Sequence, residues 1–158
     1  MPLPSVLDSQ MSMEAYGVAM DDDAITEFLE SEGLGTLAFG SERGGYALPM
    51  SFGYDSVGDR CIFQFAFGDD SAKRAFVETG NPVSLSVHEW DSIVDWRSVV
   101  VRGTLHPVPE ERSAAAAGIF AAHAKIASLE VFRQPLEELD LAWYELRIDE
   151  KQGRQSLE

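Results

Sequence analysis

Residues 46–67 read YALPMSFGYDSVGDRCIFQFAF, two runs of alternating apolar residues on either side of a polar turn. An apolar residue at every second position predicts a strand with one buried face. In the first run the large side chains fall on Tyr46, Leu48, Met50, Phe52 and Tyr54, and in the second they fall on Cys61, Phe63, Phe65 and Phe67. Residues 55–59 form the turn between them, so the stretch predicts an antiparallel hairpin.

The same period of two continues on both sides of this hairpin. Further strands are predicted at Leu34–Phe39, Val83–His88, Trp96–Leu105 and Leu141–Ile148, which gives six strands in all. Helices are predicted after Asp21–Asp23, around residues 72–79, and over the alanine-rich stretch 109–127. Strand pairs joined by short turns favour an antiparallel, barrel-like sheet with peripheral helices over a doubly wound parallel sheet.

A length of 158 residues predicts a single domain. Residues 1–20 show no clear period and carry Pro2 and Pro4, so they are expected to form a flexible N-terminal arm. Residues 21–153 form the predicted domain, and residues 154–158 form a polar tail.

The composition limits the possible partners and the location of the protein. Acidic residues number 27 against 12 lysines and arginines, a formal net charge of −15. Nucleic acid and anionic membranes attract basic surfaces, so neither is expected as a partner. No uninterrupted apolar run is long enough for a membrane span and no signal peptide is evident, which makes the cytoplasm the expected location. Cys61 stands alone, which excludes an internal disulfide, and it is expected in the core.

The acidic surface also suggests a halophilic protein. The chain has three lysines and nine arginines, and such an acidic, lysine-poor surface suits solubility in high salt, where repulsion between like charges is screened. An ordinary acidic protein is the alternative. The halophilic hypothesis predicts that the midpoint of thermal unfolding rises along a potassium chloride series, and a midpoint that stays constant or falls would contradict it.

Three segments are candidates for binding a ligand. The small residues Ala47, Pro49, Ser51 and Gly53 share one face, against which a flat ligand could lie, although the same face could pack under a helix. In the segment Gly68–Arg74 a strand gives way to a helix, and Ser71, Lys73 and Arg74 could hold a phosphate there. The alternative is that Asp69 and Asp70 merely cap that helix.

The third segment opens the fifth predicted strand. Trp96 could stack on a ligand and Ser98 could donate a hydrogen bond, and the alternative is an aromatic strand end beside a solvated Arg97. No arrangement of serine, cysteine and histidine indicates a nucleophile with a base, and His88, His106 and His123 form no motif. Chemistry supplied by a bound cofactor would need no such residues.

Four stretches, in their order and spacing, resemble the pyridoxamine 5′-phosphate oxidase-related flavoproteins. They are residues 47–55 (ALPMSFGYD), 62–68 (IFQFAFG) with Ser71–Lys73, 81–85 (NPVSL) and 96–103 (WRSVVVRG). The resemblance covers roughly residues 20–153. It implies a mainly β fold, a six-stranded antiparallel split β-barrel with peripheral helices, and non-covalent FMN at the interface of a homodimer.

The resemblance also implies which residues contact FMN. By position, Pro49, Met50 and Ser51 run beside the flavin ring and ribityl chain, and Ala66 and Phe67 line the same site. Ser71 and Lys73 are expected to hold the phosphate of FMN, with Arg74 as a further candidate. Ser98 and Val99 contribute from a strand of the same subunit or of its partner.

Departures from the family pattern bear on the activity. Ala72 stands where many relatives have a basic residue, and Gln64 stands where many have histidine. Arg147 and Arg154 are the only candidates for the basic C-terminal residues that hold the vitamin B6 substrate in the oxidase itself. The expectation is therefore an FMN-dependent oxidoreductase with a small-molecule electron donor and acceptor, both unidentified.

Two rival hypotheses remain open from the sequence. A binding module of the same fold could hold deazaflavin F420 or haem in place of FMN. Alternatively, the chain could be a small acidic interaction domain without a cofactor, in which case the protein would be colourless and added FMN would not stabilise it.

Overall fold

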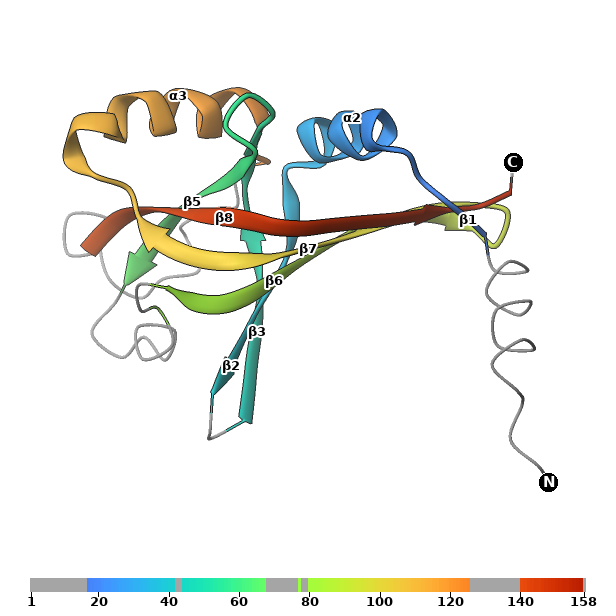
Figure 1. Cartoon of the computed structure of the whole chain (residues 1–158), viewed down its shortest axis with the longest axis horizontal. Helices are drawn as coiled ribbons and strands as arrows, with labels where there is room; N and C mark the ends of the chain where they lie inside the picture. The colour runs from blue at the N-terminus through green and yellow to red at the C-terminus, as the bar shows by residue number, and fades with distance from the viewer. Residues whose placement is uncertain (1–16, 42–43, 68–76, 78–79, 126–139, 158) are drawn as a thin grey trace.

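A computed structural model describes residues 17–41, 44–67, 77, 80–125 and 140–157. These residues form one antiparallel sheet with two α-helices (Figure 1). The strands are β1 (Val18–Ala19), β2 (Leu34–Ser41), β3 (Gly44–Ser51), β4 (Gly53–Asp55), β5 (Arg60–Phe67), β6 (Asn81–Ser92), β7 (Asp95–Pro107) and β8 (Asp140–Gln155). The helices are α2 (Asp22–Glu32) and α3 (Ser113–His123), the latter preceded by the 3₁₀ turn η2 (Glu110–Arg112).

The connection between the sheet edges explains why the sheet curls. Neighbouring strands follow the order β3-β2-β6-β7-β8-β5-β4, and β1 pairs with β8. The edge strands β3 and β4 are separated in sequence by Phe52 alone. Because one residue joins the two edges, the sheet must bend until they approach each other, and it remains unclosed. The predicted fold class, a mainly β antiparallel sheet of the split-barrel type, is confirmed.

The number of strands differs from the prediction, since the sheet formed by the described residues has eight strands rather than six. The predicted strand Tyr46–Tyr54 is broken at Phe52, whose backbone N–H donates to the Gly33 carbonyl at 3.0 Å instead of joining the ladder. The short strand β1 adds a further one. Apolar alternation continues through Phe52, so the sequence pattern does not reveal the break.

The last strand is longer than predicted. β8 spans 16 residues, from Asp140 to Gln155, where Leu141–Ile148 was expected. Its second half is polar but pairs with β7, and Gln155 and Arg154 pair with Val18 and Ala19 of β1. The ends of the proposed arm and tail therefore meet in the sheet. Strand pairing, rather than apolar periodicity, sets this boundary.

Helix α2 forms as its sequence predicts. The Asp21 carboxylate caps it by accepting from the Ala24 N–H at 2.8 Å, and Ile25, Phe28 and Leu29 form its buried face. Gly33 ends the helix in the left-handed conformation, at φ 67°. A Cβ added there would lie 2.3 Å from the His123 carbonyl oxygen, so only glycine fits where α2 meets the end of α3.

Two apolar clusters lie on opposite faces of β5. The larger fills the barrel and contains the fully buried Phe63, Phe65, Leu85 and Val101, together with the α2 stripe. Cys61 is buried there as predicted, and burial raises the pKa of its thiol. The smaller cluster, Ile62, Ala116 and Phe120, lies under α3. Both helices lie on the same side of the long strands (Figure 1).

Helix α3 is shorter than the predicted range 109–127. Residues 110–112 form η2, and the helix ends at His123 because Ala124 takes an extended conformation. The helix predicted around residues 72–79 lies outside the described residues, apart from the buried Val77.

Candidate functional site

The end of β3 is fixed by contacts with the residues that follow the two helices. The Gly33 carbonyl accepts from the backbone N–H groups of Phe52 and Lys125, each at 3.0 Å. The Ser51 hydroxyl donates to the Lys125 carbonyl. Pro49 is exposed on this edge strand, whereas the Met50 side chain is 8% exposed and belongs to the barrel core. In this predicted segment, Pro49 and Ser51 can present side chains to a ligand and Met50 can offer its backbone.

The outer face of β3 has the shape that a planar group needs. Ala47 and Pro49 are exposed, and Tyr46 and Leu48 on the opposite face pack against the core. A Cβ added at Gly45, which shares the face of Ala47 and Pro49, would find its nearest neighbour 3.7 Å away. Within the described residues the small face predicted from alternation is open at Ala47 and Pro49, which fit a flat ligand such as a flavin ring. At Gly53 the alternative holds, because this residue is buried under α3, where an added Cβ would lie 2.8 Å from the Ile119 carbonyl oxygen.

The end of β5 lies within the core. Ala66 and Phe67 are each 5% exposed, and the Phe67 ring stacks on Phe65 with centroids 5.7 Å apart. They pair with Leu141 and Asp140 at the beginning of β8. The roles predicted for Ala66 and Phe67 stay predictions.

The third predicted segment lies at the other end of β8. Ser98 is partly exposed and pairs with His88 on β6 and Arg154 on β8, whereas Val99 is fully buried. Arg154 also donates from Nη2 to the Gly17 carbonyl at 2.8 Å. Of this pair, Ser98 can present a side chain to a ligand.

Two of the predicted segments pair with opposite ends of β8. Phe67 pairs with Asp140 and Ser98 pairs with Arg154, which are 14 positions apart on β8 (154 minus 140). At about 3.3 Å per residue this is roughly 46 Å along the strand, much longer than a flavin mononucleotide. Ser71, Lys73 and Arg74 lie outside the described residues.

The described histidines belong to separate environments. His106 Nε2 lies 2.9 Å from the Thr104 hydroxyl, His123 Nδ1 lies 3.3 Å from the Glu30 carbonyl, and His88 is exposed on β6. Among the described residues, no group of histidine, cysteine or acidic side chains is arranged to hold a metal ion.

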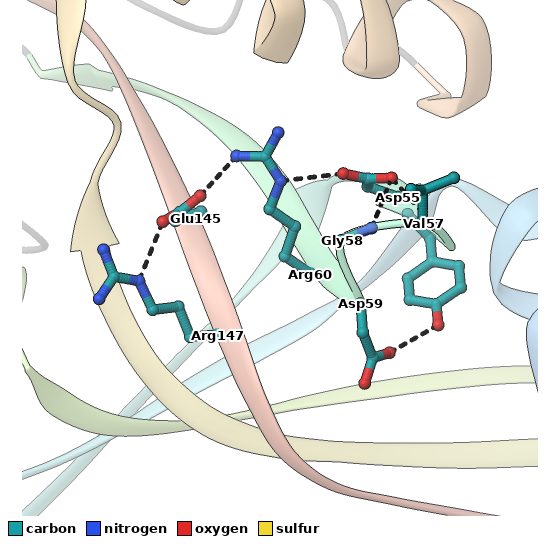
Figure 2. Close-up of polar contacts among 8 residues, drawn as sticks. Asp55, Val57, Gly58, Asp59, Arg60, Glu145 and Arg147 are labelled. Atoms are coloured by element: carbon teal, nitrogen blue, oxygen red, sulfur yellow. Dashed lines mark hydrogen bonds and ion pairs between the residues drawn. The ribbon is translucent and has the colours of Figure 1, made fainter. Parts of the chain in front are cut away.

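A network of ion pairs on β5 and β8 was not predicted from the sequence (Figure 2). Glu145 is 2% exposed, and its two oxygens accept from Arg60 Nη1 at 2.6 Å and Arg147 Nε at 2.9 Å. Burial raises the pKa of the Glu145 carboxyl, but the hydrogen bonds from the two arginines outweigh it, so the pKa is lowered. Glu145 and Arg60 are 85 residues apart, and no local pattern joins them.

The network continues through the turn between β4 and β5. Asp55 accepts from Arg60 Nε at 3.0 Å and from the backbone N–H groups of Val57 and Gly58, each at 3.1 Å. Asp59 accepts from the Tyr54 hydroxyl at 2.7 Å and from Lys151 at 2.6 Å. Burial raises the pKa of both carboxyls, but these hydrogen bonds outweigh it, so both pKa values are lowered.

Comparison with known proteins identifies the family. Residues 21–155 match a family model described as pyridoxamine 5′-phosphate oxidase. The chain belongs to this family. The family resemblance of the four sequence stretches is thereby confirmed. A search of curated proteins finds no match.

Solved structures share the fold of this family member. The FAD binding protein from Mycobacterium smegmatis has a TM-score of 0.65 at 17% identity, over 88% of this chain and 98% of that one. A FAD-binding protein from Mesorhizobium loti has a TM-score of 0.62 at 18% identity, over 88% and 97%. The FAD and heme binding protein from Mycobacterium smegmatis has a TM-score of 0.62 at 19% identity, over 87% and 72%. At these identities the likeness concerns the fold.

In the part of this family member that the structure describes, no helix has the length and apolar character needed to cross a membrane.

Proposed function

We propose that this chain is an FMN-dependent oxidoreductase that acts in the cytoplasm as a homodimer. Membership of the pyridoxamine 5′-phosphate oxidase family over residues 21–155 is the observation that carries the proposal. The open face of β3 supports it, because Ala47 and Pro49 leave room for a planar ring beside the strand. The FAD-binding proteins of the same fold also favour a flavin.

The residues present indicate which steps the cofactor would perform and which the protein would perform. A bound flavin would supply the redox chemistry by accepting and donating a hydride or electrons. The protein would position it: Pro49 and the backbone of Met50 beside the ring, and Ser71, Lys73 and Arg74 at the phosphate. Ser51 already donates its hydroxyl proton to the Lys125 carbonyl, so towards a ligand its oxygen would act as an acceptor.

The geometry of β8 supports a site shared between two subunits. Ala66 with Phe67 and Ser98 with Val99 pair with opposite ends of this strand. If both pairs contact one flavin, they must come from different subunits, because roughly 46 Å of strand separates them within one chain. Each dimer would then hold two flavins, one at each copy of the shared site.

The cofactor proposal is tested by the absorption spectrum of the purified protein and by identification of the chromophore released on denaturation. A flavin band that releases FMN supports the proposal. Release of FAD, F420 or haem would keep the fold and replace the cofactor. A colourless protein that gains no thermal stability from added FMN or FAD would contradict flavin binding and favour the interaction domain.

The Lys73→Ala variant is expected to bind FMN more weakly by about 1.5–3 kcal/mol, the scale of a hydrogen bond to a charged group. Titration of FMN into the apoprotein, followed by flavin fluorescence, measures the change. The Lys73→Arg variant keeps the positive charge and is expected to retain most of the affinity. Equal affinity in the Lys73→Ala variant and the natural protein would remove Lys73 from the site.

Subunit mixing tests the shared site. The Lys73→Ala and Ser98→Arg chains are each expected to bind FMN poorly as homodimers. A mixed dimer would contain one site in which Lys73 and Ser98 are both intact, so it is expected to recover one bound FMN per two chains. No recovery in a verified mixed dimer would show that Lys73 and Ser98 serve the same subunit's site, and normal binding by either homodimer would remove its substituted residue from the site.

A further inference from the structure

A pocket of the described structure lies beside the ion-pair network. Its volume is about 550 Å³, and its wall is formed by the turn between β4 and β5, by η2 and by β8. Three arginines, Arg60, Arg112 and Arg147, line it. We propose that this arginine pocket binds a small oxyanion, the phosphate or carboxylate group of a small metabolite, independently of the flavin site.

The carboxylates of the arginine pocket are already neutralised by the protein. Asp55 and Glu145 share Arg60, Glu145 also holds Arg147, and Asp59 pairs with Lys151. Figure 2 shows Asp55, Arg60, Glu145 and Arg147 as one continuous series of contacts. The lining carries three arginines and three carboxylates, three positive charges against three negative ones. The pocket is therefore balanced in charge, in a chain whose net charge is −15.

Two guanidinium groups have N–H donors that make no hydrogen bond within the described residues. Arg147 uses Nε towards Glu145, and within the described residues no hydrogen bond involves its two Nη groups. Arg112 lines the pocket from η2, is exposed, and has no side-chain hydrogen bond or ion pair in the described part of the chain. The planar fork of a guanidinium matches the spacing of carboxylate and phosphate oxygens. Arg112 and Arg147 are therefore the direct ligands, and Arg60 holds Glu145 in place.

The ligand class follows from charge and size. A volume of this order admits a small metabolite. The net charge of −15 repels anions at long range, so binding depends on short, direct contacts with the guanidinium groups. An oxyanion with two negative charges would bind most tightly, because it can pair with both Arg112 and Arg147.

The arginine pocket is separate from two of the segments assigned to the flavin. On β8, Arg147 lies seven positions after Asp140 and seven positions before Arg154. Asp140 pairs with Phe67, and Arg154 pairs with Ser98. Seven residues of strand span roughly 23 Å. A phosphate in the arginine pocket is therefore distinct from one held near Phe67 or Ser98.

The test is titration calorimetry of inorganic phosphate and, in parallel, succinate into the full chain saturated with FMN, at constant ionic strength in chloride. The Arg112→Gln variant is expected to bind the preferred ion at least about tenfold more weakly, the effect of losing a hydrogen bond to a charged group. The matched control is Arg102→Gln on β7, whose side chain is 61% exposed and 3.6 Å from Glu150, and it is expected to bind normally.

Each outcome decides the proposal. Loss of binding in Arg112→Gln with retention in Arg102→Gln supports it, and the stronger of the two ions names the ligand group. Equal binding in both variants would place the ion elsewhere and overturn the proposal, as would no binding of either ion. If phosphate binding is lost in Lys73→Ala but kept in Arg112→Gln, the ion occupies the flavin phosphate site and the proposal is also wrong.

Discussion

The Glu145→Gln variant is expected to unfold with a free energy about 3 kcal/mol lower than that of the natural chain. Removing one partner of a buried ion pair leaves the other charge without compensation, which typically costs about 3–5 kcal/mol. The lower end of this range applies because Arg60 remains paired with Asp55 and because the side chain of Arg147 is 53% exposed. Urea denaturation at neutral pH, followed by tryptophan fluorescence, measures the difference.

The dependence on pH provides a second readout of the same network. The pKa values of Asp55, Asp59 and Glu145 are all lowered from their ordinary values of 3.8, 3.8 and 4.5. The unfolded chain then binds more protons than the folded chain as the pH falls below those values, so stability is lost there. In the Glu145→Gln variant this loss should be shallower, and the gap to the natural chain should narrow towards acid pH.

The control is Glu150→Gln, since Glu150 is 47% exposed and lies 3.6 Å from Arg102. An exposed pair of this kind contributes little, and this variant is expected to stay within about 0.5 kcal/mol of the natural chain. A Glu145→Gln variant that is as stable as the control would show that the two arginines do not depend on Glu145.

The Gly103→Ala variant is expected to lose about 3 kcal/mol of stability, the upper end of typical overpacking. A Cβ at residue 103 would lie 1.9 Å from the Arg147 carbonyl oxygen and 2.8 Å from the Leu146 side chain. The obstacle is backbone in the middle of the β7–β8 pairing, where the register shifts between Arg102 and Gly103. The two strands would have to separate, because a carbonyl group cannot rotate away as a side-chain end can.

The Gly118→Ala variant is the matched control, and its stability is expected to change in the opposite direction. Gly118 lies within α3, and a Cβ there would find nothing within 4 Å. Alanine in a helix interior is more favourable than glycine by about 0.5–1 kcal/mol, so this variant should be more stable than the natural chain. Thermal unfolding of both variants side by side checks the pair. Similar stability for both would show that the β7–β8 pairing accommodates a methyl group at residue 103.

Local sequence determined much of this fold. The alternation of Cys61, Phe63, Phe65 and Phe67 predicted a strand with one buried face, and all four side chains are buried. Asp21 and Gly33 marked the two ends of α2. Strand period and helix caps depend on residues a few positions apart, so they can be read without knowledge of the rest of the chain. The resemblance added the family, which residues 21–155 confirm.

Pairings between distant residues were decided by the tertiary structure alone. The Phe52 break depends on the Gly33 carbonyl, and the second half of β8 is a strand because β7 and β1 pair with it. The sequence indicated the candidate flavin residues one segment at a time, but the folded chain puts two of those segments at opposite ends of β8.

The arginine pocket arises in the same way, since Arg60 and Glu145 meet across 85 residues. The polar side chains involved carry no periodic signal, and strand register alone selects their partners. Sequence therefore determined which segments become strands and helices, because those preferences are local. Tertiary structure decided which charges meet and which predicted residues can share a ligand, because both depend on how the strands align.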